Sequence, residues 1–308
     1  MSTLSSALEN YLALRRSMGF KLERTGKLLA QFVAYCETAS ATTVTIELAI
    51  RWATLPQNGN ANWVAQRLSA VRGFAKHLAL RDHCSEVPPA DLLPVRSQRA
   101  TPYLYSEAEV LKLMAAAGRL RSPLRRATLS TLVGLLWVTG MRIGEALRLD
   151  CHDVNLVHGV VVVRNSKFGK SRELPIHEST TAALRSYAKR RDELCPQANA
   201  PAFFLSLAGR RLRYDGFHLT FLGLVRGANI VRRSKACRPR PHDFRHSFAV
   251  RTLIDWYRDH GDVESRLPRL STYLGHVHPA NTYWYLSAAP ELLSLAAQRL
   301  ERATEVVA

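Results

Sequence analysis

The feature that most constrains the fold is a break in helical periodicity at residues 83–104, HCSEVPPADLLPVRSQRATPYL. Before it, from residue 5 to about 81, apolar residues recur at spacings of three and four, as on the buried face of amphipathic helices. Prolines and polar residues interrupt this pattern, which is typical of an interdomain linker. We therefore expect an all-helical bundle over residues 1–83, a linker over 84–103 and a second domain over 104–308.

The second domain is predicted to be mainly α with a small β-sheet. Ser106 and Glu109 have the spacing of a capping box before an apolar helical run, and a long apolar helix is expected over about 123–139. Residues 159–176, GVVVVRNSKFGKSRELPI, predict a β-hairpin with a basic tip, because β-branched residues lead into a polar turn that contains glycine. A short strand could form at AFFLS, residues 202–206.

The charge of the chain favours a polyanionic partner. Lys and Arg number 43 against 25 for Asp and Glu, a net charge of +18. Residues 1–100 hold 12 basic and 7 acidic side chains and the remainder 31 and 18, so the excess is spread nearly evenly. An even distribution fits two domains that both face nucleic acid phosphates, although a generally basic surface would give the same counts.

The cysteines and apolar runs restrict the compartment. The five cysteines are far apart and form no CxxC pair, which indicates free thiols in a reducing environment. The N-terminal residues lack the features of a signal peptide, and no apolar run approaches the length of a membrane span. We expect a cytoplasmic, nucleoid- or DNA-associated protein without a membrane partner. We also expect no metal and no cofactor, because no acidic cluster suits two Mg²⁺ ions.

Three groups of polar residues could bind phosphate. Arg142 begins a helix in TGMRIGEALRL, where Glu145 could simply pair with it. The hairpin tip carries Arg164, Lys167, Lys170 and Arg172. His242 and Arg245, in RPHDFRHSFAV, are three residues apart at a helix N-terminus, which favours an anion. Taken singly, none of these groups indicates catalysis, because a solvated surface residue or a local ion pair explains each one more simply.

The order of these groups resembles the tyrosine recombinase family of phage integrases and Xer-type recombinases. An arginine at a turn-to-helix junction, a hairpin lysine, HxxR, LGH and a tyrosine nine residues later follow one another as in that family. The resemblance covers the whole chain. It implies a helical, SAM-like core-binding domain that binds DNA, followed by an α+β catalytic domain with a helical C-terminal tail.

The resemblance also assigns residues. Arg142 matches the first catalytic arginine, with Glu145 as its acidic support. Lys167 matches the hairpin lysine, with Lys170 as the alternative. The HxxR pair, the second histidine and the nucleophile correspond to His242, Arg245, His276 and Tyr285.

The implied chemistry is site-specific DNA strand cleavage and rejoining through a covalent 3′-phosphotyrosyl intermediate, without metal or ATP. Two guanidiniums can clamp the non-bridging oxygens of the phosphodiester, while Tyr285 attacks phosphorus and His242 takes the phenol proton. Lys167 would protonate the departing 5′-oxygen, and His276 would hydrogen-bond a non-bridging oxygen. Two alternatives remain: a non-catalytic or accessory DNA-binding protein of the same fold, and an activity like that of a type IB topoisomerase.

Spacing distinguishes the two tyrosines of NTYWYL. Residues two apart on a helix point about 200° away from each other, so Tyr283 and Tyr285 cannot both face one phosphate. Tyr285 lies nine residues after His276, as the family's nucleophile does. Tyr283 is therefore expected to be a core or supporting residue.

The remaining expectations concern partners. The family implies a homotetramer on paired double-stranded DNA sites, in some cases with partner recombinases. The amphipathic C-terminal tail could dock on a neighbouring protomer or fold back on its own domain. We expect the helices at 24–38 and 61–80 to contact bases in the DNA grooves. Further DNA contacts are expected from Arg232, Arg233 and Arg240.

Overall fold

The computed structural model describes residues 3–56, 61–92, 101–165, 169–198, 200–259, 261–287 and 289–305. The chain divides into two compact units, Met1–Arg99 and Ala100–Ala308. The division lies within the segment that interrupts the helical periodicity of the sequence. Among the described residues, no helix combines the length and the apolar character that crossing a bilayer requires.

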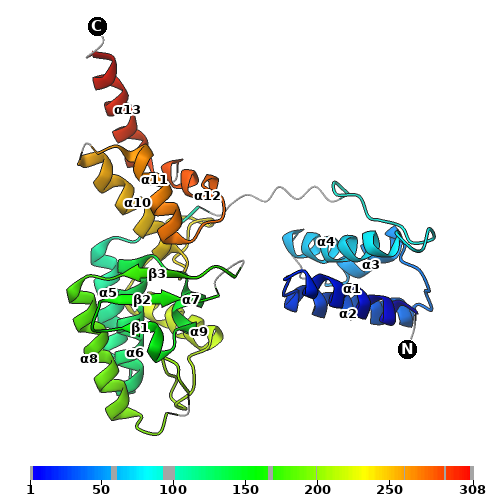
Figure 1. Cartoon of the computed structure of the whole chain (residues 1–308), viewed down its shortest axis with the longest axis horizontal. Helices are drawn as coiled ribbons and strands as arrows, with labels where there is room; N and C mark the ends of the chain where they lie inside the picture. Colours follow the sequence, from blue (N-terminus) through cyan, green and yellow to red (C-terminus); the bar gives the residue numbers. More distant parts are fainter. Residues whose placement is uncertain are drawn as a thin grey trace. The chain divides into compact units, whose positions relative to one another are not determined.

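The first unit consists of helices in its described residues (Figure 1). Leu29, Phe32, Val71 and Phe74 come from two of these helices and are completely buried, as their three- and four-residue spacing predicts. Thr45 caps the third helix by accepting a hydrogen bond from the Leu48 backbone. The helices are α1 (Thr3–Ser17), α2 (Glu23–Thr38), α3 (Ile46–Thr54) and α4 (Ala61–Leu78).

The second unit is built around a helical core. Ser106 and Glu109 form the predicted capping box at the start of its first helix. The predicted long apolar helix also forms, and Leu132, Val133 and Leu136 are fully buried within it. The core helices are α5 (Glu107–Gly118), α6 (Pro123–Thr139), α7 (Ile143–Arg148), α8 (Glu178–Leu194) and α9 (Tyr214–Gly227).

A three-stranded antiparallel sheet of order β1-β2-β3 packs on this core. Its strands are β1 (Val154–Asn155), β2 (Val160–Val163) and β3 (Arg172–Pro175), and the short 3-10 helix η1 (Cys151–Asp153) precedes them. Val163 pairs with Arg172, so the predicted hairpin is confirmed in its two strands. The strand expected at AFFLS is wrong: Ala202 and Leu205 make isolated bridges to Asp150 and Arg211. Their backbone partners lie in loops, which do not extend a ladder.

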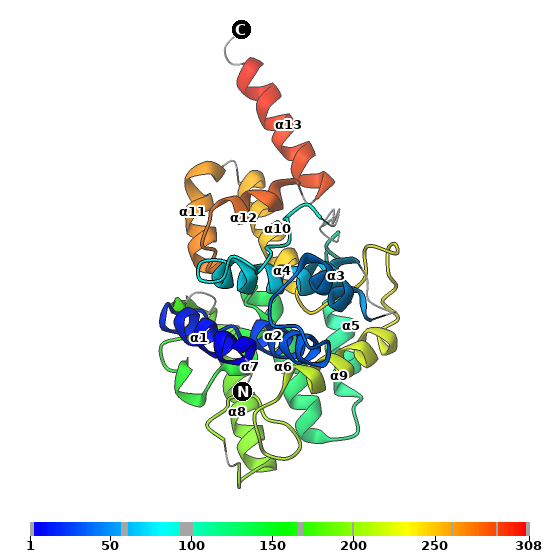
Figure 2. The same cartoon turned by 90° about the vertical axis from the view of Figure 1, so that its right-hand side faces the viewer.

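The last part of the second unit has an apolar cluster of its own. Leu253, Leu270, Leu274 and Leu292 belong to it, and each is at most 3% exposed. Figures 1 and 2 both show α10, α11 and α12 grouped together, with α13 extending away from them. The elements are α10 (Asp243–Arg258), α11 (Val263–Leu274), α12 (Ala280–Tyr283), the 3-10 helix η3 (Trp284–Ser287) and α13 (Pro290–Glu305).

Candidate active site

Arg142 lies at the N-cap of α7, directly after the sharp turn that ends α6. Gly140 makes this turn with a φ of 58°, and a Cβ at this position would come within 2.6 Å of the Phe248 ring. Glycine avoids both the left-handed strain and the clash. The Arg142 backbone N–H and its Nη1 donate to the Glu145 carboxylate at 3.0 and 2.7 Å. The turn therefore presents the arginine, and the carboxylate orients it.

The buried carboxylate of Glu145 binds two arginines. It is 3% exposed and accepts hydrogen bonds from Arg172 Nη1 and Nη2 at 3.3 and 2.8 Å, in addition to those from Arg142. Burial by itself would raise the pKa of the carboxyl, but the hydrogen bonds and charge of Arg172, together with the bonds from Arg142, lower it to about 2. Glu145 is therefore ionised at neutral pH.

Arg245 projects from the first turn of α10 into the same region. It is 2% exposed, and its guanidinium donates to the carbonyls of Gly140 and Leu274 at 3.2 and 2.6 Å. Arg142 Nη2 donates to the next carbonyl, that of Gly275, at 3.2 Å. Burial lowers the pKa of Arg245 to about 10, which leaves it a cation at pH 7. Two guanidinium cations therefore lie beside each other at the end of α11.

Two histidines follow each other by one helical turn at the start of α10. His242 is the N-cap residue and is exposed, and its ring centroid lies 4.9 Å from that of His246. The His246 ring in turn packs 5.4 Å from Tyr285 and 5.2 Å from Trp284. His246 Nδ1 is buried and has no hydrogen-bond partner among the described residues.

His276 follows the glycine that ends α11. Gly275 has a φ of 68° and reverses the chain. His276 Nδ1 lies 2.7 Å from the hydroxyl of Thr282, which is 1% exposed, and its ring stacks 5.9 Å from Tyr285. The hydroxyl fixes the orientation of the imidazole and leaves Nε2 to meet another group.

The histidines of this site are neutral at pH 7. Desolvation, followed by the charges of Arg245 and Arg142, lowers the pKa values of His242 and His276 to about 4. For the exposed His242 the two arginine charges are the firmer cause, because they act through space even where water reaches the ring. Desolvation, followed by the neighbouring His242, lowers the pKa of His246 to about 3. A neutral imidazole can accept a proton.

The two tyrosines lie in opposite environments. Tyr285 is 3% exposed and packs in the apolar cluster of the last helices, against His246, His276 and Trp284. Tyr283 is 52% exposed, so the expectation of a core residue is wrong, while the alternative of a supporting residue stays a prediction. The physical reason is that residues two apart on a helix point in nearly opposite directions, so the Tyr285 ring lies in the apolar cluster and the Tyr283 ring in solvent.

The residues expected to contact DNA divide by environment. Arg232 is exposed. Arg233 donates to the Leu104 carbonyl and stacks on Tyr103, and Arg164 donates to Asp153. Arg240 donates three hydrogen bonds to the buried Asp243, two from its side chain and one from its backbone. Lys170 is exposed at the hairpin. Arg172 points inward, with its side chain 10% exposed. Lys167 lies outside the described residues.

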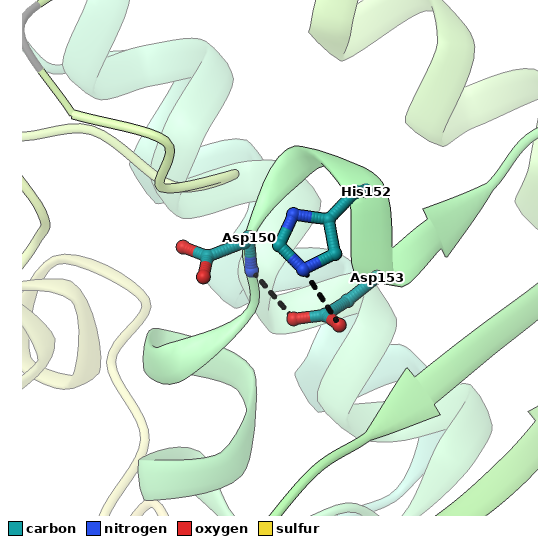
Figure 3. Close-up of side chains that lie close together, drawn as sticks. All are labelled: Asp150, His152 and Asp153. Atoms are coloured by element: carbon teal, nitrogen blue, oxygen red, sulfur yellow. Dashed lines mark hydrogen bonds and ion pairs between the residues drawn. The ribbon is translucent and has the colours of Figure 1, made fainter.

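Within the described part of the chain, one group of side chains outside this site has the composition of a metal site. Asp150, His152 and Asp153 gather at η1 (Figure 3). Asp153 accepts hydrogen bonds from the Asp150 backbone and from Arg164, and Asp150 accepts one from Arg211. Arginines therefore neutralise both carboxylates, and the cluster is explained as a support for the sheet.

Sequence reasoning did not single out His246 or Thr282, and it grouped Arg172 with the surface contacts. A signal existed for His246, because it lies four residues after His242 and so on the same face of a helix. Thr282 and Arg172 carried no such signal. Their partners His276 and Glu145 are 6 and 27 residues away, and only the fold brings each pair together.

Comparisons with known proteins identify the family of the chain. Residues 104–291 match the model of the phage integrase family. The chain is 44% identical over 311 residues to a Sinorhizobium fredii protein named "Putative integrase/recombinase y4rB", with 99% of each chain covered. It is 30% identical over 246 residues to the tyrosine recombinase XerC of Roseiflexus sp., which covers 79% of this chain and 74% of that protein.

Solved structures show the same fold at lower identity. The Tn1549 transposon integrase in complex with circular intermediate DNA aligns with a TM-score of 0.65 and 18% identity, covering 96% of this chain and 99% of that one. A lambda integrase dimer bound to a core site aligns with a TM-score of 0.58 and 18% identity, covering 91% and 96%.

Proposed function

This chain belongs to the phage integrase family of tyrosine site-specific recombinases, and we propose that it cleaves and rejoins double-stranded DNA through a 3′-phosphotyrosyl intermediate on Tyr285. The observation that carries the proposal is the convergence of two arginines and three neutral histidines with one tyrosine at the ends of α10 and α11. A phosphodiester is the substrate whose charge and geometry these groups suit.

In the proposed reaction, Arg142 and Arg245 bind the non-bridging oxygens of the scissile phosphate. The negative charge of the transition state spreads over these oxygens, so fixed guanidiniums stabilise it more than the ground state. Both arginines are held by carbonyl or carboxylate partners, which orient their guanidiniums before the reaction. The neutral Nε2 of His276 would hydrogen-bond one of the same oxygens.

Proton transfer accompanies the attack. The Tyr285 oxygen forms a bond to phosphorus, the phenol proton passes to neutral His242, and the bond from phosphorus to the 5′-oxygen breaks. Lys167 would give its proton to that leaving oxygen. Rejoining is the reverse reaction, in which a 5′-hydroxyl attacks the phosphotyrosine. It needs no external energy, because the phosphotyrosyl ester conserves the energy of the cleaved phosphodiester bond.

The test of this function is a trapped adduct. Wild-type protein is incubated with DNA fragments flanking its own gene, each carrying a nick that lets the short cleaved strand diffuse away, and denatured with detergent. We expect a covalent protein–DNA adduct whose sequence gives the site and the polarity. Tyr285→Phe should form none while still binding DNA, and the matched control Tyr283→Phe should react normally because its ring faces solvent.

The outcomes separate the alternatives. No adduct from the wild-type protein on any fragment that it binds would indicate an accessory DNA-binding protein. Adduct formation with supercoil relaxation but without strand exchange between two sites would indicate a topoisomerase. An equal loss in the Tyr283 and Tyr285 variants would reject the assignment of the nucleophile.

We further propose that the helical unit binds DNA as a core-binding domain and that four protomers assemble on two sites, with or without a partner recombinase. Helix α13 supports a contact between protomers, since it extends from the unit and Leu293 is 56% exposed beside the buried Leu292. Deletion of residues 296–308 should leave binding of one protomer to DNA intact and remove higher complexes in a gel-shift titration. Unchanged higher complexes would show that this helix is not the contact.

A further inference from the structure

Three consecutive carbonyls at the end of α11 each accept a hydrogen bond from a different arginine. Arg172 Nε donates to Tyr273 at 2.7 Å, Arg245 Nη2 to Leu274 at 2.6 Å and Arg142 Nη2 to Gly275 at 3.2 Å. The last carbonyls of a helix lack helical partners and carry its negative partial charge. Arginines from three separate elements therefore converge on this helix end, just before His276.

Arg172 differs from the other two arginines in how its donors are used. Besides the carbonyl of Tyr273, its guanidinium holds both oxygens of Glu145, through Nη1 at 3.3 Å and Nη2 at 2.8 Å. The Arg172 side chain is 10% exposed and that of Glu145 is 1% exposed. All three of its nitrogens thus donate to protein acceptors, whereas among the described residues Arg142 and Arg245 each donate through Nη1 and Nη2 alone.

The guanidinium also rests against the turn that carries His276. A Cβ built on Gly275 would lie 2.9 Å from Arg172 Nη1, closer than real Cβ contacts. The His276 backbone N–H donates back to Ser271, so the turn is closed on the helix. The location of Arg172 consequently fixes both the carboxylate that orients Arg142 and the backbone from which His276 projects.

We propose that Arg172 is a positioning residue for the recombination reaction and not a DNA contact. Arg172 acts through Arg142 and His276. It holds Glu145 against Arg142, and it holds the end of α11 so that His276 faces the phosphate bound by Arg142. This inference rests on the proposed function, because it concerns the same phosphate. It assigns to the base of the hairpin a role separate from that of the Lys167 proton donor.

The first test compares Arg172→Lys with Arg148→Lys, the same change at an exposed residue of α7. A lysine keeps the charge but has one nitrogen, which cannot bond both Glu145 oxygens and the Tyr273 carbonyl together. We expect the single-turnover rate of adduct formation to fall about 10²-fold in Arg172→Lys, since small misplacements cost that much. The dissociation constant for DNA should stay unchanged, and Arg148→Lys should resemble the wild type.

A modified substrate separates positioning of the arginine clamp from positioning of the proton donor. With sulfur in place of the bridging 5′-oxygen, the leaving thiolate needs no proton. The deficit of Arg172→Lys should persist on this substrate. Full recovery would mean that Arg172 serves the hairpin lysine and would overturn the proposal. An unchanged rate on normal DNA, or a loss explained by weaker DNA binding, would overturn it as well.

A second variant covers the case in which Arg172→Lys does not fold. Gly275→Ala displaces the Arg172 guanidinium while leaving every charge in place. Its control is Gly19→Ala, where φ is also positive but no atom lies within 4 Å of the new Cβ. We expect adduct formation to fall in Gly275→Ala alone, and equal rates in both variants would contradict the proposal. Absence of adduct in the wild-type protein would instead reject the proposed function itself.

Discussion

Replacing Glu145 by glutamine removes one charge from the most buried ion pair of the site. The carboxylate receives the backbone N–H and Nη1 of Arg142 and two nitrogens of Arg172. Glutamine has nearly the same shape but is neutral, and its amide nitrogen is a donor that would face guanidinium donors. Arg172, at 10% side-chain exposure, is then left without a counter-ion.

The magnitude follows from two separate arguments. The pKa of Glu145 falls from 4.5 to about 2, which corresponds to a stabilisation of the ionised state by about 3 kcal/mol. Removing one partner of a buried ion pair costs about 3–5 kcal/mol in general. Because the folded pKa lies below the unfolded one, this contribution is complete above pH 4.5 and is lost as the pH falls toward 2. We therefore expect Glu145→Gln to cost about 3 kcal/mol at pH 7.

The assay is urea denaturation at pH 7, followed by hydrogen–deuterium exchange so that peptides of the second unit are scored separately. The control is Glu47→Gln, which breaks an exposed pair with Arg51 and should cost no more than about 1 kcal/mol. If Glu145→Gln costs no more than this control, the buried cluster does not stabilise the site and the electrostatic argument is refuted.

Further predictions concern the groups around the nucleophile. Thr282→Val, which removes the hydroxyl beside His276, should slow adduct formation about tenfold without changing DNA affinity; an unchanged rate would show that the hydroxyl does not orient the imidazole. His246→Ala should also slow adduct formation, because the His246 ring packs against Tyr285, whereas the control His218→Ala should not slow it. Equal rates in the two variants would contradict this role of His246. The folded pKa values of these site histidines lie below their ordinary 6.5, so the unfolded chain binds more protons and stability should fall between pH 7 and pH 5. A urea midpoint that is higher at pH 5 than at pH 7 would contradict this pH dependence. Chelation by EDTA should leave adduct formation unchanged, and a loss restored by Mg²⁺ would refute clamping by arginine alone.

Local elements followed from the sequence because their causes are local. The capping box of Ser106 and Glu109, the helix of residues 123–139 and the two hairpin strands depend on interactions within a few residues or on simple periodicity. The strand predicted at AFFLS did not form, because a strand depends on a distant partner. Its apolar residues have the composition of a strand, yet a strand needs a partner, and the segment found only single bridges.

The set of candidate site residues followed from order and spacing along the chain, as did the preference for Tyr285 over Tyr283. The environment of each residue did not. Whether a tyrosine is exposed depends on which side of its helix packs against the other helices, and whether Arg172 turns inward depends on a carboxylate 27 residues away. Arg142 meets the Gly275 carbonyl across 133 residues. The sequence determined which groups are present and in what order, because motif spacing and helix periodicity are short-range properties. Only the tertiary structure decided which of them lie next to one another, because that depends on how distant segments pack.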